Sequence, residues 1–340
     1  MSKNFKPIII VTGDPNSIFY EIFFKTFKKI KCKNPIILIT CKKKFFREAK
    51  IFKFIKKVDI IDLKKTNFIF KRSSINLIDI ELKVSKNKKN NDILLNNYIE
   101  KSFDFALDLI KKKISNKLLN GPINKKKFLN KKYLGVTEYV ASKINKREFG
   151  MLIYNKSLSV CPMTTHLPVK KVVPFVTKKN IIEKVIIINE FYKNFLKIKP
   201  RIAVTGLNPH CESILDFNED DKITKPAIKL LKKKDFSIDG PFSADTIFLK
   251  DNRKNYDVVL GMYHDQVLTP IKTLFEFNAI NITMGLPFLR VSPDHGPNYK
   301  MVGKNISNHN SFLESVKFLD QIWSELKKAL VKTFLMTKML

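Results

Sequence analysis

The sequence predicts an α/β fold with mostly parallel sheets. Short runs rich in β-branched residues alternate with longer segments of helical periodicity, which is typical of strands connected by helices. The chain has 340 residues, enough for two domains, and 44% of them are hydrophobic, close to the average of globular proteins. No segment rich in Pro, Gly and Ser separates the halves, so we expect domains connected by crossing strands and not by a flexible linker.

The expected strands are apolar runs at residues 8–11, 36–40, 58–62, 158–163, 201–206, 256–262 and 280–285. The expected helices lie near residues 17–31, 98–113, 136–146, 180–197, 219–234 and 308–332, and several begin at Ser, Asn or Asp. Residues 64–97 differ, because two strand-like pieces (NFIF and INLIDIEL) are followed by the Lys- and Asn-rich segment 85–92. We interpret that segment as an exposed loop.

We expect two α/β domains. If the final helix packs back on the beginning of the chain, residues 1–125 and 270–340 form the first domain and residues 126–269 form an inserted second one. A cleft between domains is a usual place for a ligand, so we expect the functional site there.

The charge is unusual. Lys and Arg number 64 against 31 Asp and Glu, a formal net charge of +33, which raises the question of a nucleic-acid or membrane partner. Only six of these cations are Arg, and the Lys residues are scattered through the whole length. Sequence-specific nucleic-acid readers depend on Arg for its planar fork, so we expect a compositional bias and no specific nucleic-acid partner. The charge also favours phosphorylated or polyanionic small substrates through long-range attraction.

The cysteines and apolar runs indicate a reducing compartment. Cys32, Cys41, Cys161 and Cys211 form no CxxC pair, so neither a disulfide scaffold nor a cysteine zinc site is predicted. The apolar run at 7–11 is too short for a signal peptide, and no run reaches the length of a membrane span. We expect a cytoplasmic protein with no membrane partner.

Three of the five histidines follow predicted strands. His166, His210 and His264 come after the runs ending near 163, 206 and 262, and the carboxyl ends of parallel strands open onto one edge of a sheet. Converging neutral imidazoles would form a divalent-metal site with open positions, suited to zinc or a related ion. The alternative is that each histidine caps a loop or satisfies a buried hydrogen bond.

Other polar residues are candidates for the same site. Asp245 lies near the start of a helical stretch, where it could simply favour the helix N-terminus or could accept a hydrogen bond from a metal-bound histidine. Asp265, directly after His264, could do the same. Lys272, Asn281 and Arg290 fall at expected element ends, and two cations with an amide suit an anionic substrate.

Several common motifs are missing. No GxGxxG follows a strand, and no P-loop or GxSxG occurs, so a Rossmann fingerprint and a serine nucleophile elbow are not predicted. The nucleotide contacts therefore stay unknown.

The phrases themselves resemble one family, the 4-hydroxythreonine-4-phosphate dehydrogenases of pyridoxal phosphate biosynthesis. The resemblance runs through almost the whole chain, in the order VTGDP (11–15), NGPINK (120–125), TEYVA (137–141), TTHLPVKKV (164–172), GLNPH (206–210), GPFSADTIF (240–248), MYHDQ (262–266) and NITMGLPFLRVSPDHG (281–296).

This resemblance implies a two-domain fold like that of the isocitrate and isopropylmalate dehydrogenases, and a homodimer with its active site at the subunit interface. It implies that one divalent ion (Zn, Mg or Co) per subunit is bound by His166, His210 and His264. Substrate binding is implied for Thr137, Lys272, Asn281 and Arg290, and catalytic roles for Asp245 and Lys272. The implied reaction oxidises the 3-hydroxyl of a phosphorylated amino acid with NAD or NADP, and loss of carbon dioxide gives 3-amino-2-oxopropyl phosphate.

Two positions depart from the family pattern. We would expect GDPAGIGPE after the first strand and GHTE before the second domain, whereas this chain has GDPNSIFYE at 13–21 and GVTE at 135–138. Val136 thus replaces a substrate-contacting histidine and removes a hydrogen-bond donor, and the first turn has less backbone freedom.

Two other functions remain open. One is a related metal-dependent dehydrogenase for another phosphorylated or carboxylated hydroxy compound, which Val136 favours. The other is a catalytically silent binding protein, which the complete set of three histidines disfavours.

Overall fold

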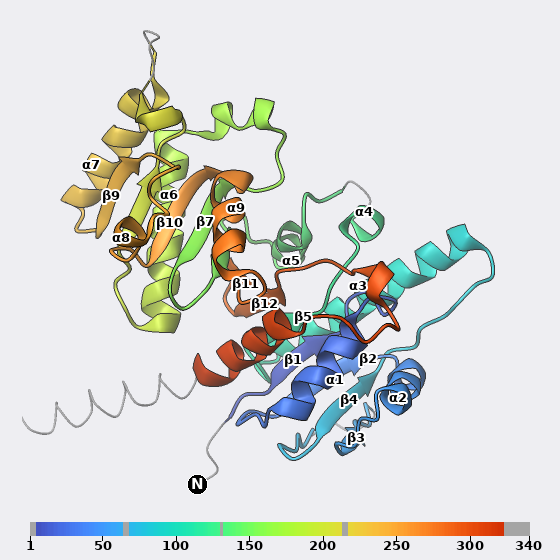
Figure 1. Ribbon diagram of the computed structural model, residues 1–340. Coiled ribbons are helices and arrows are strands. Elements are labelled where there is room, and N and C mark those ends of the chain that lie inside the picture. The colour runs from blue at the N-terminus through green and yellow to red at the C-terminus, as the bar shows by residue number, and fades with distance from the viewer. Residues whose placement is uncertain (1–4, 64–67, 130–131, 213–216, 323–340) are drawn as a thin grey trace, which may run out of the picture. The chain divides into compact units, whose positions relative to one another are not determined.

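The computed structural model describes residues 5–63, 68–129, 132–212 and 217–322 (Figure 1). By its internal contacts the chain divides into two compact units. Unit 1 comprises Met1–Val136 and Pro287–Leu340, and unit 2 comprises Thr137–Leu286. Among the described residues, no helix is both long enough and apolar enough to cross a membrane.

Unit 1 contains a parallel sheet that is buried by helices. Its strands are, in spatial order, β3 (Val58–Ile60), β4 (Ile75–Asp79), β2 (Ile36–Thr40), β1 (Ile8–Val11), β5 (Lys117–Asn120) and β12 (Leu289–Pro293). Every neighbouring pair for which the register is known runs parallel, as with Ile9 of β1 opposite Leu118 of β5. The α/β class predicted from the sequence is confirmed in this unit.

The helices of unit 1 cover this sheet with an unusually aromatic layer. They are α1 (Phe19–Lys29), α2 (Lys42–Ile51), α3 (Lys88–Lys111), the short α4 (Lys125–Phe128) and the helical residues 310–322. In α1 the aromatic residues recur every three or four positions, so they share the buried face. The rings of Phe23 and Phe27 are tilted by 45° with centroids 4.6 Å apart, and the ring centroid of Phe19 lies 5.8 Å from that of Phe312 in the last helix.

The Lys- and Asn-rich segment 85–92 is only partly a loop, so that expectation was wrong. Helix α3 begins at Lys88, ten residues before the predicted helix. The side chain of Asn87 accepts a hydrogen bond from the backbone N–H of Asn90 (3.2 Å) and caps the helix. Of the two predicted strand pieces before it, the second is β4, whereas Phe68–Phe70 are not extended in a strand and residue 67 lies outside the described residues.

Unit 2 contains a mixed sheet with the order β11 (Ile280–Met284), β6 (Gly150–Tyr154), β7 (Ser159–Thr164), β10 (Val258–Tyr263), β8 (Ile202–Thr205) and β9 (Ile238–Phe242). Strand β6 pairs antiparallel with β11 and β7, and the last four strands run parallel. The helices are α5 (Val136–Lys143), α6 (Lys178–Phe191), α7 (Lys225–Lys233), α8 (Lys250–Arg253) and α9 (His264–Phe275). Because β7, β10 and β8 are parallel neighbours, their carboxyl ends lie at one edge of the sheet.

The expected domain boundaries after residues 125 and 269 differ from these divisions. Helix α9 continues through residue 269 without a break. Strand β11 pairs with β6 at five successive positions, from Ile280 opposite Tyr154 to Met284 opposite Gly150. Residues 270–286 therefore belong with unit 2.

Strands β5, β6, β9 and β12 were not predicted. Strand β5 is only four residues long and begins with a lysine, β9 contains the pair Gly240–Pro241, and β12 carries Arg290. Lys, Gly and Pro are depleted in strands, and here tertiary pairing outweighs their local preference.

Lys117 is a buried cation at the start of β5. Its side chain is 1% exposed, and its Nζ has no hydrogen-bond partner among the described residues. Burial lowers the pKa of Lys117 from 10.5 to about 8, although Asp320 and Cys32 act in the opposite direction. In the unfolded chain this lysine holds its proton to higher pH than in the folded chain, so its contribution to stability is unfavourable at neutral pH and improves as the pH rises from about 8 to about 10.5.

We therefore expect Lys117→Met to raise the free energy of unfolding at pH 7 by on the order of 3 kcal/mol. The gain should shrink at pH 9.5, because wild-type Lys117 is then neutral when folded. Urea unfolding at both pH values checks this. Lys101→Met, which changes an exposed lysine of α3, is the control and should alter stability by less than about 0.5 kcal/mol. A Lys117→Met variant less stable than wild type at pH 7 would contradict the prediction.

Candidate functional site

The three strand-end histidines lie at the carboxyl edge of three adjacent parallel strands. His166 follows β7 by two residues, His264 follows β10 directly as the first residue of α9, and His210 follows β8 by five residues. Strand β10 lies between the other two, with Tyr263 opposite Thr164 of β7 and Leu260 opposite Val204 of β8.

Two of the three histidines are side by side. The ring centroids of His166 and His264 are 5.6 Å apart, and the planes are tilted by 43°. Two imidazoles bound through nitrogen to one tetrahedral ion, with metal–nitrogen distances near 2 Å, place their centroids about 5 Å apart. The spacing of this pair therefore fits a shared divalent ion.

Asp265 controls which nitrogen of His264 is available. Nδ1 of His264 lies 2.6 Å from Oδ1 of Asp265, so a proton between these atoms leaves the lone pair of Nε2 free. A carboxylate in this position is the usual partner of a metal-binding imidazole. Of the two aspartates considered from the sequence, Asp265 makes this contact. Asp245 lies exposed in the turn after β9, and no hydrogen bond of its carboxylate to a histidine is found within the described ranges.

His210 is held in a different way. Its backbone has a left-handed conformation (φ 54°, ψ 15°), and its Nδ1 lies 3.3 Å from Oγ of Ser243. Among the described residues, which omit 213–216 in the same loop, no three His, Cys, Asp or Glu side chains come close enough together to bind one ion. The structure thus pairs His166 with His264 and does not bring His210 to them.

Unit 2 also contains three of the four predicted substrate-binding residues. Thr137 is 7% exposed in α5, and its Oγ1 lies 3.4 Å from Oγ1 of Thr283 in β11. Asn281 lies two positions earlier in β11 and so shares a face with Thr283; its Oδ1 is buried with no hydrogen-bond partner in the described part of the chain. Lys272 is exposed in the last turn of α9.

Arg290, the fourth predicted residue, belongs to unit 1. It lies in β12, is only 2% exposed, and donates a hydrogen bond from Nε to Oδ1 of Asn120 (2.8 Å). A guanidinium buried to this extent has its orientation fixed by its neighbours, which is a property of residues that bind anions in a defined geometry.

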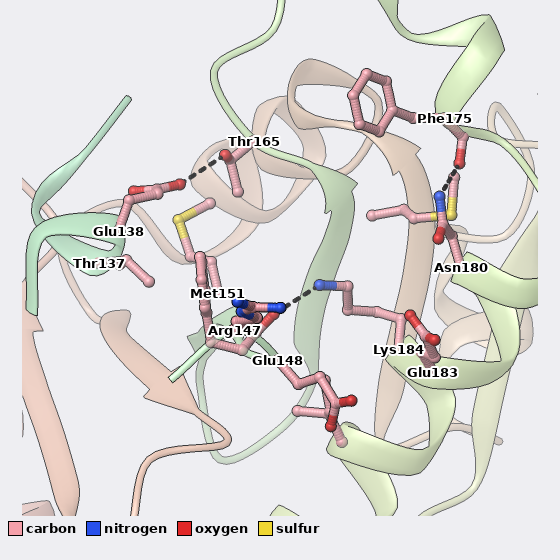
Figure 2. A pocket seen from close by; sticks show the side chains of 14 residues that line it. Thr137, Glu138, Arg147, Glu148, Met151, Thr165, Phe175, Asn180, Glu183 and Lys184 are labelled. Atoms are coloured by element: carbon pink, nitrogen blue, oxygen red, sulfur yellow. Dashed lines mark hydrogen bonds between the residues drawn. The ribbon is translucent and has the colours of Figure 1, made fainter. Parts of the chain in front are cut away.

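A pocket of about 330 Å³ adjoins Thr137 (Figure 2). Oε1 of Glu138 accepts a hydrogen bond from Oγ1 of Thr165 (3.2 Å), which connects the helix that carries Thr137 to the strand end that carries His166. In the same pocket lining, Nζ of Lys184 donates a hydrogen bond to the carbonyl oxygen of Phe149 (2.8 Å). The lining is a mixture of apolar and charged side chains: Thr137, Glu138, Arg147, Glu148, Phe149, Gly150, Met151, Met163, Thr165, Phe175, Asn180, Glu183, Lys184 and Ile187.

Sequence reasoning did not single out Glu138 or Thr165. Each is the immediate neighbour of a residue that was singled out, Thr137 and His166 respectively. Their side chains meet only because α5 and β7 fold together, so no local pattern marks the pair.

The Gly-poor turn after β1 is held in place by hydrogen bonds to its own side chains. Gly13 alone needs glycine's freedom, because its φ is +73° and a Cβ there would lie 2.6 Å from the carbonyl oxygen of Pro122. The buried carboxylate of Asp14 accepts hydrogen bonds from the N–H of Asn16 (2.8 Å) and from the hydroxyl of Tyr299. Oγ of Ser17 accepts from the N–H of Phe19 (3.2 Å) at the start of α1. Ser17, which stands where the family pattern has a glycine, thus supplies a side-chain hydrogen bond of its own.

Comparison with known proteins decides the family. Residues 31–319 match the family described as "Pyridoxal phosphate biosynthetic protein PdxA". The chain belongs to the PdxA family. That match covers both units and all three strand-end histidines.

Relatives in the PdxA family carry two kinds of name. A 4-hydroxythreonine-4-phosphate dehydrogenase of Sulfurihydrogenibium sp. is 36% identical over 316 residues, which are 91% of this chain and 96% of the relative. A D-threonate 4-phosphate dehydrogenase of Pectobacterium atrosepticum is 29% identical over 93% of this chain and 99% of the relative. The crystal structure of 4-hydroxythreonine-4-phosphate dehydrogenase from Klebsiella pneumoniae superposes with a TM-score of 0.78 at 26% identity, covering 95% of this chain and 99% of that one.

Proposed function

We propose that this protein is a metal-dependent oxidoreductase that converts 4-phosphooxy-L-threonine to 3-amino-2-oxopropyl phosphate with NAD or NADP, as a cytoplasmic step of pyridoxal phosphate biosynthesis. A hydride passes from C3 of the substrate to the nicotinamide, the 3-hydroxyl loses its proton, and carbon dioxide leaves from the resulting 3-oxo acid. The observation that carries the proposal is the His166–His264 pair at a strand edge shared with His210, in a chain of the PdxA family.

The residues of the strand edge supply what this chemistry needs. His166, His264 and His210 would hold one divalent ion such as Zn, Mg or Co, which when bound supplies a Lewis acid next to the substrate hydroxyl. Asp265 keeps the proton of His264 on Nδ1. In this proposal Lys272 and Asp245, both exposed, exchange protons with the substrate.

The remaining substrate contacts are assigned by charge. Lys272 and Arg290 bind the phosphate and carboxylate, because charge-assisted hydrogen bonds to anions are the stronger ones. Thr137 and Asn281 donate hydrogen bonds that fix the orientation of the substrate, and the unpaired buried Oδ1 of Asn281 accepts one in return.

We also propose that the enzyme is a homodimer whose active site combines residues of both subunits. In the described part of a single chain, His166 and His264 are paired without His210, and a second subunit would bring another copy of each histidine to the site.

Mixing two inactive variants tests the shared site. His166→Ala and His210→Ala should each be inactive alone. If one site uses His166 of one subunit and His210 of the other, a mixed dimer keeps one intact site, so random reassociation should restore about a quarter of wild-type activity. Each variant mixed with itself is the control. No recovery, with mixed dimers shown by differently tagged subunits, would mean that His166 and His210 of one site come from the same chain.

Two observations, the names of some relatives and the apolar side chain of Val136, support a second candidate substrate. Some relatives are named D-threonate 4-phosphate dehydrogenases, and Val136 presents an apolar side chain where the family pattern has histidine. D-Threonate 4-phosphate carries a hydroxyl where the amino acid has its ammonium group, so the two substrates differ in the charge at C2.

Turnover of the two phosphorylated substrates is the direct test of the proposed function. We expect reduction of NAD or NADP by 4-phosphooxy-L-threonine in the presence of Zn²⁺, Co²⁺ or Mg²⁺, with a higher kcat/KM than for D-threonate 4-phosphate. The reverse order would assign the protein to the second substrate. No turnover of either, with metal bound, would contradict the proposal.

Val136→His should raise kcat/KM for 4-phosphooxy-L-threonine, mainly by lowering KM. A donor toward a charged group contributes on the order of 1.5–3 kcal/mol, roughly ten- to a hundredfold in affinity, and this contact is expected in ground and transition states alike. Val136→Leu, which adds bulk without a donor, is the control. Val136 is 7% exposed, so a substitution there can disturb the fold. Circular dichroism of each variant therefore checks that it is folded before its kinetics are compared. An unchanged KM would mean that another group already fills the role.

A further inference from the structure

We propose that Gln266 is a positioning residue that sets the spacing between the strand ends carrying His210 and His264. The inference rests on the proposed function, because it concerns the metal-binding histidines. Gln266 lies two residues after His264 in α9, and its side chain points back to the sheet and not to any expected ligand.

The amide of Gln266 connects two strands. Its Oε1 accepts hydrogen bonds from the N–H of Met262 in β10 (2.7 Å) and from Oγ1 of Thr205 at the end of β8 (2.7 Å). Its Nε2 donates to the carbonyl oxygen of Gly206 (2.8 Å). One side chain therefore binds three groups at the ends of two adjacent strands.

The beginning of the loop from Gly206 to His210 is held by the hydrogen bond from Gln266 to Gly206 and by further contacts of its own. A Cβ at Gly206 would lie 2.6 Å from Sγ of Cys211, so the loop folds tightly back on itself. The fully buried carboxylate of Asp220 accepts from the N–H groups of Leu207 and Asn208, both at 2.9 Å. A shift of Gly206 would consequently be passed on to His210, whose backbone is already held in a left-handed conformation.

The third strand, β7, is hydrogen-bonded to the same residue of β10, Met262. Oγ1 of Thr164 in β7 donates to the carbonyl oxygen of Met262 (2.9 Å). The backbone of Met262 thus accepts a hydrogen bond from β7 through its carbonyl oxygen and donates one to Gln266 through its N–H. The three strand ends that lead to His166, His264 and His210 therefore form one hydrogen-bonded network. Gln266 is the member of this network that reaches from β10 to β8.

The alternative is that Gln266 is a structural crosslink with no bearing on the site. Both roles predict a loss of stability when the amide is removed, so stability alone does not separate them. Only a positioning role predicts weaker metal binding, because groups that orient metal ligands typically affect affinity by roughly 10- to 100-fold.

The test is Zn²⁺ and Co²⁺ affinity of the metal-free, full-length protein, measured by calorimetry and by competition with a chelator. We expect Gln266→Leu, which keeps the size and removes all three hydrogen bonds, to bind both ions roughly 10- to 100-fold more weakly than wild type. Thr205→Val removes one of the three hydrogen bonds and should give a smaller loss, so the proposal stays testable if Gln266→Leu does not fold.

Asn76→Leu is the matched control. Asn76 is a fully buried amide in unit 1, and it makes three hydrogen bonds to the backbone of Ile36 and Lys71, each 2.9 Å. Its loss should reduce the thermal unfolding temperature about as much as Gln266→Leu and leave metal affinity unchanged. Wild-type affinity in folded Gln266→Leu and Thr205→Val would overturn this inference alone, whereas failure of the wild-type protein to bind Zn²⁺, Co²⁺ or Mg²⁺ would overturn the metal-dependent function itself.

Discussion

The direction of three neighbouring strands is the constraint on which the site depends. Because β7, β10 and β8 run parallel and adjacent, the chain leaves the sheet at one edge three times, and each exit leads to a histidine within five residues. An antiparallel neighbour would send one of these segments to the opposite edge. The His166–His264 pair, the Asp265 contact and the Gln266 network all follow from this arrangement.

Buried polar groups, more than the apolar core, determine where the loops lie. Asp220 holds the segment before His210, Asp14 closes the turn after β1, and Asn120 orients Arg290. Each of these side chains is at most 3% exposed, and a buried polar group must find a partner or lose stability. Such groups therefore fix loop positions more sharply than non-directional apolar contacts do, and Lys117, which lacks a partner among the described residues, shows the unfavourable case.

Sequence reasoning was most successful where the pattern is local. The apolar runs at 8–11, 36–40 and 256–262 are strands because their β-branched residues are buried on both faces. The positions of the three histidines follow from the predicted runs at 158–163, 201–206 and 256–262, which correspond to β7, β8 and β10. In contrast, the start of α3 depends on one capping asparagine, and β6 and β12 depend on partners far away in the sequence. The pairs Glu138–Thr165 and Gln266–Thr205 are 27 and 61 residues apart, so no periodicity reveals them.

X-ray absorption spectroscopy at the metal edge of the Zn²⁺- or Co²⁺-loaded protein tests the central claim, that the strand-edge histidines form the metal site. The account predicts three imidazole ligands with metal–nitrogen distances of about 2.0–2.1 Å, and the loss of one imidazole in His210→Ala. A sulfur shell at about 2.3 Å, pointing to a cysteine such as Cys211, or a shell made of oxygen alone, would contradict it.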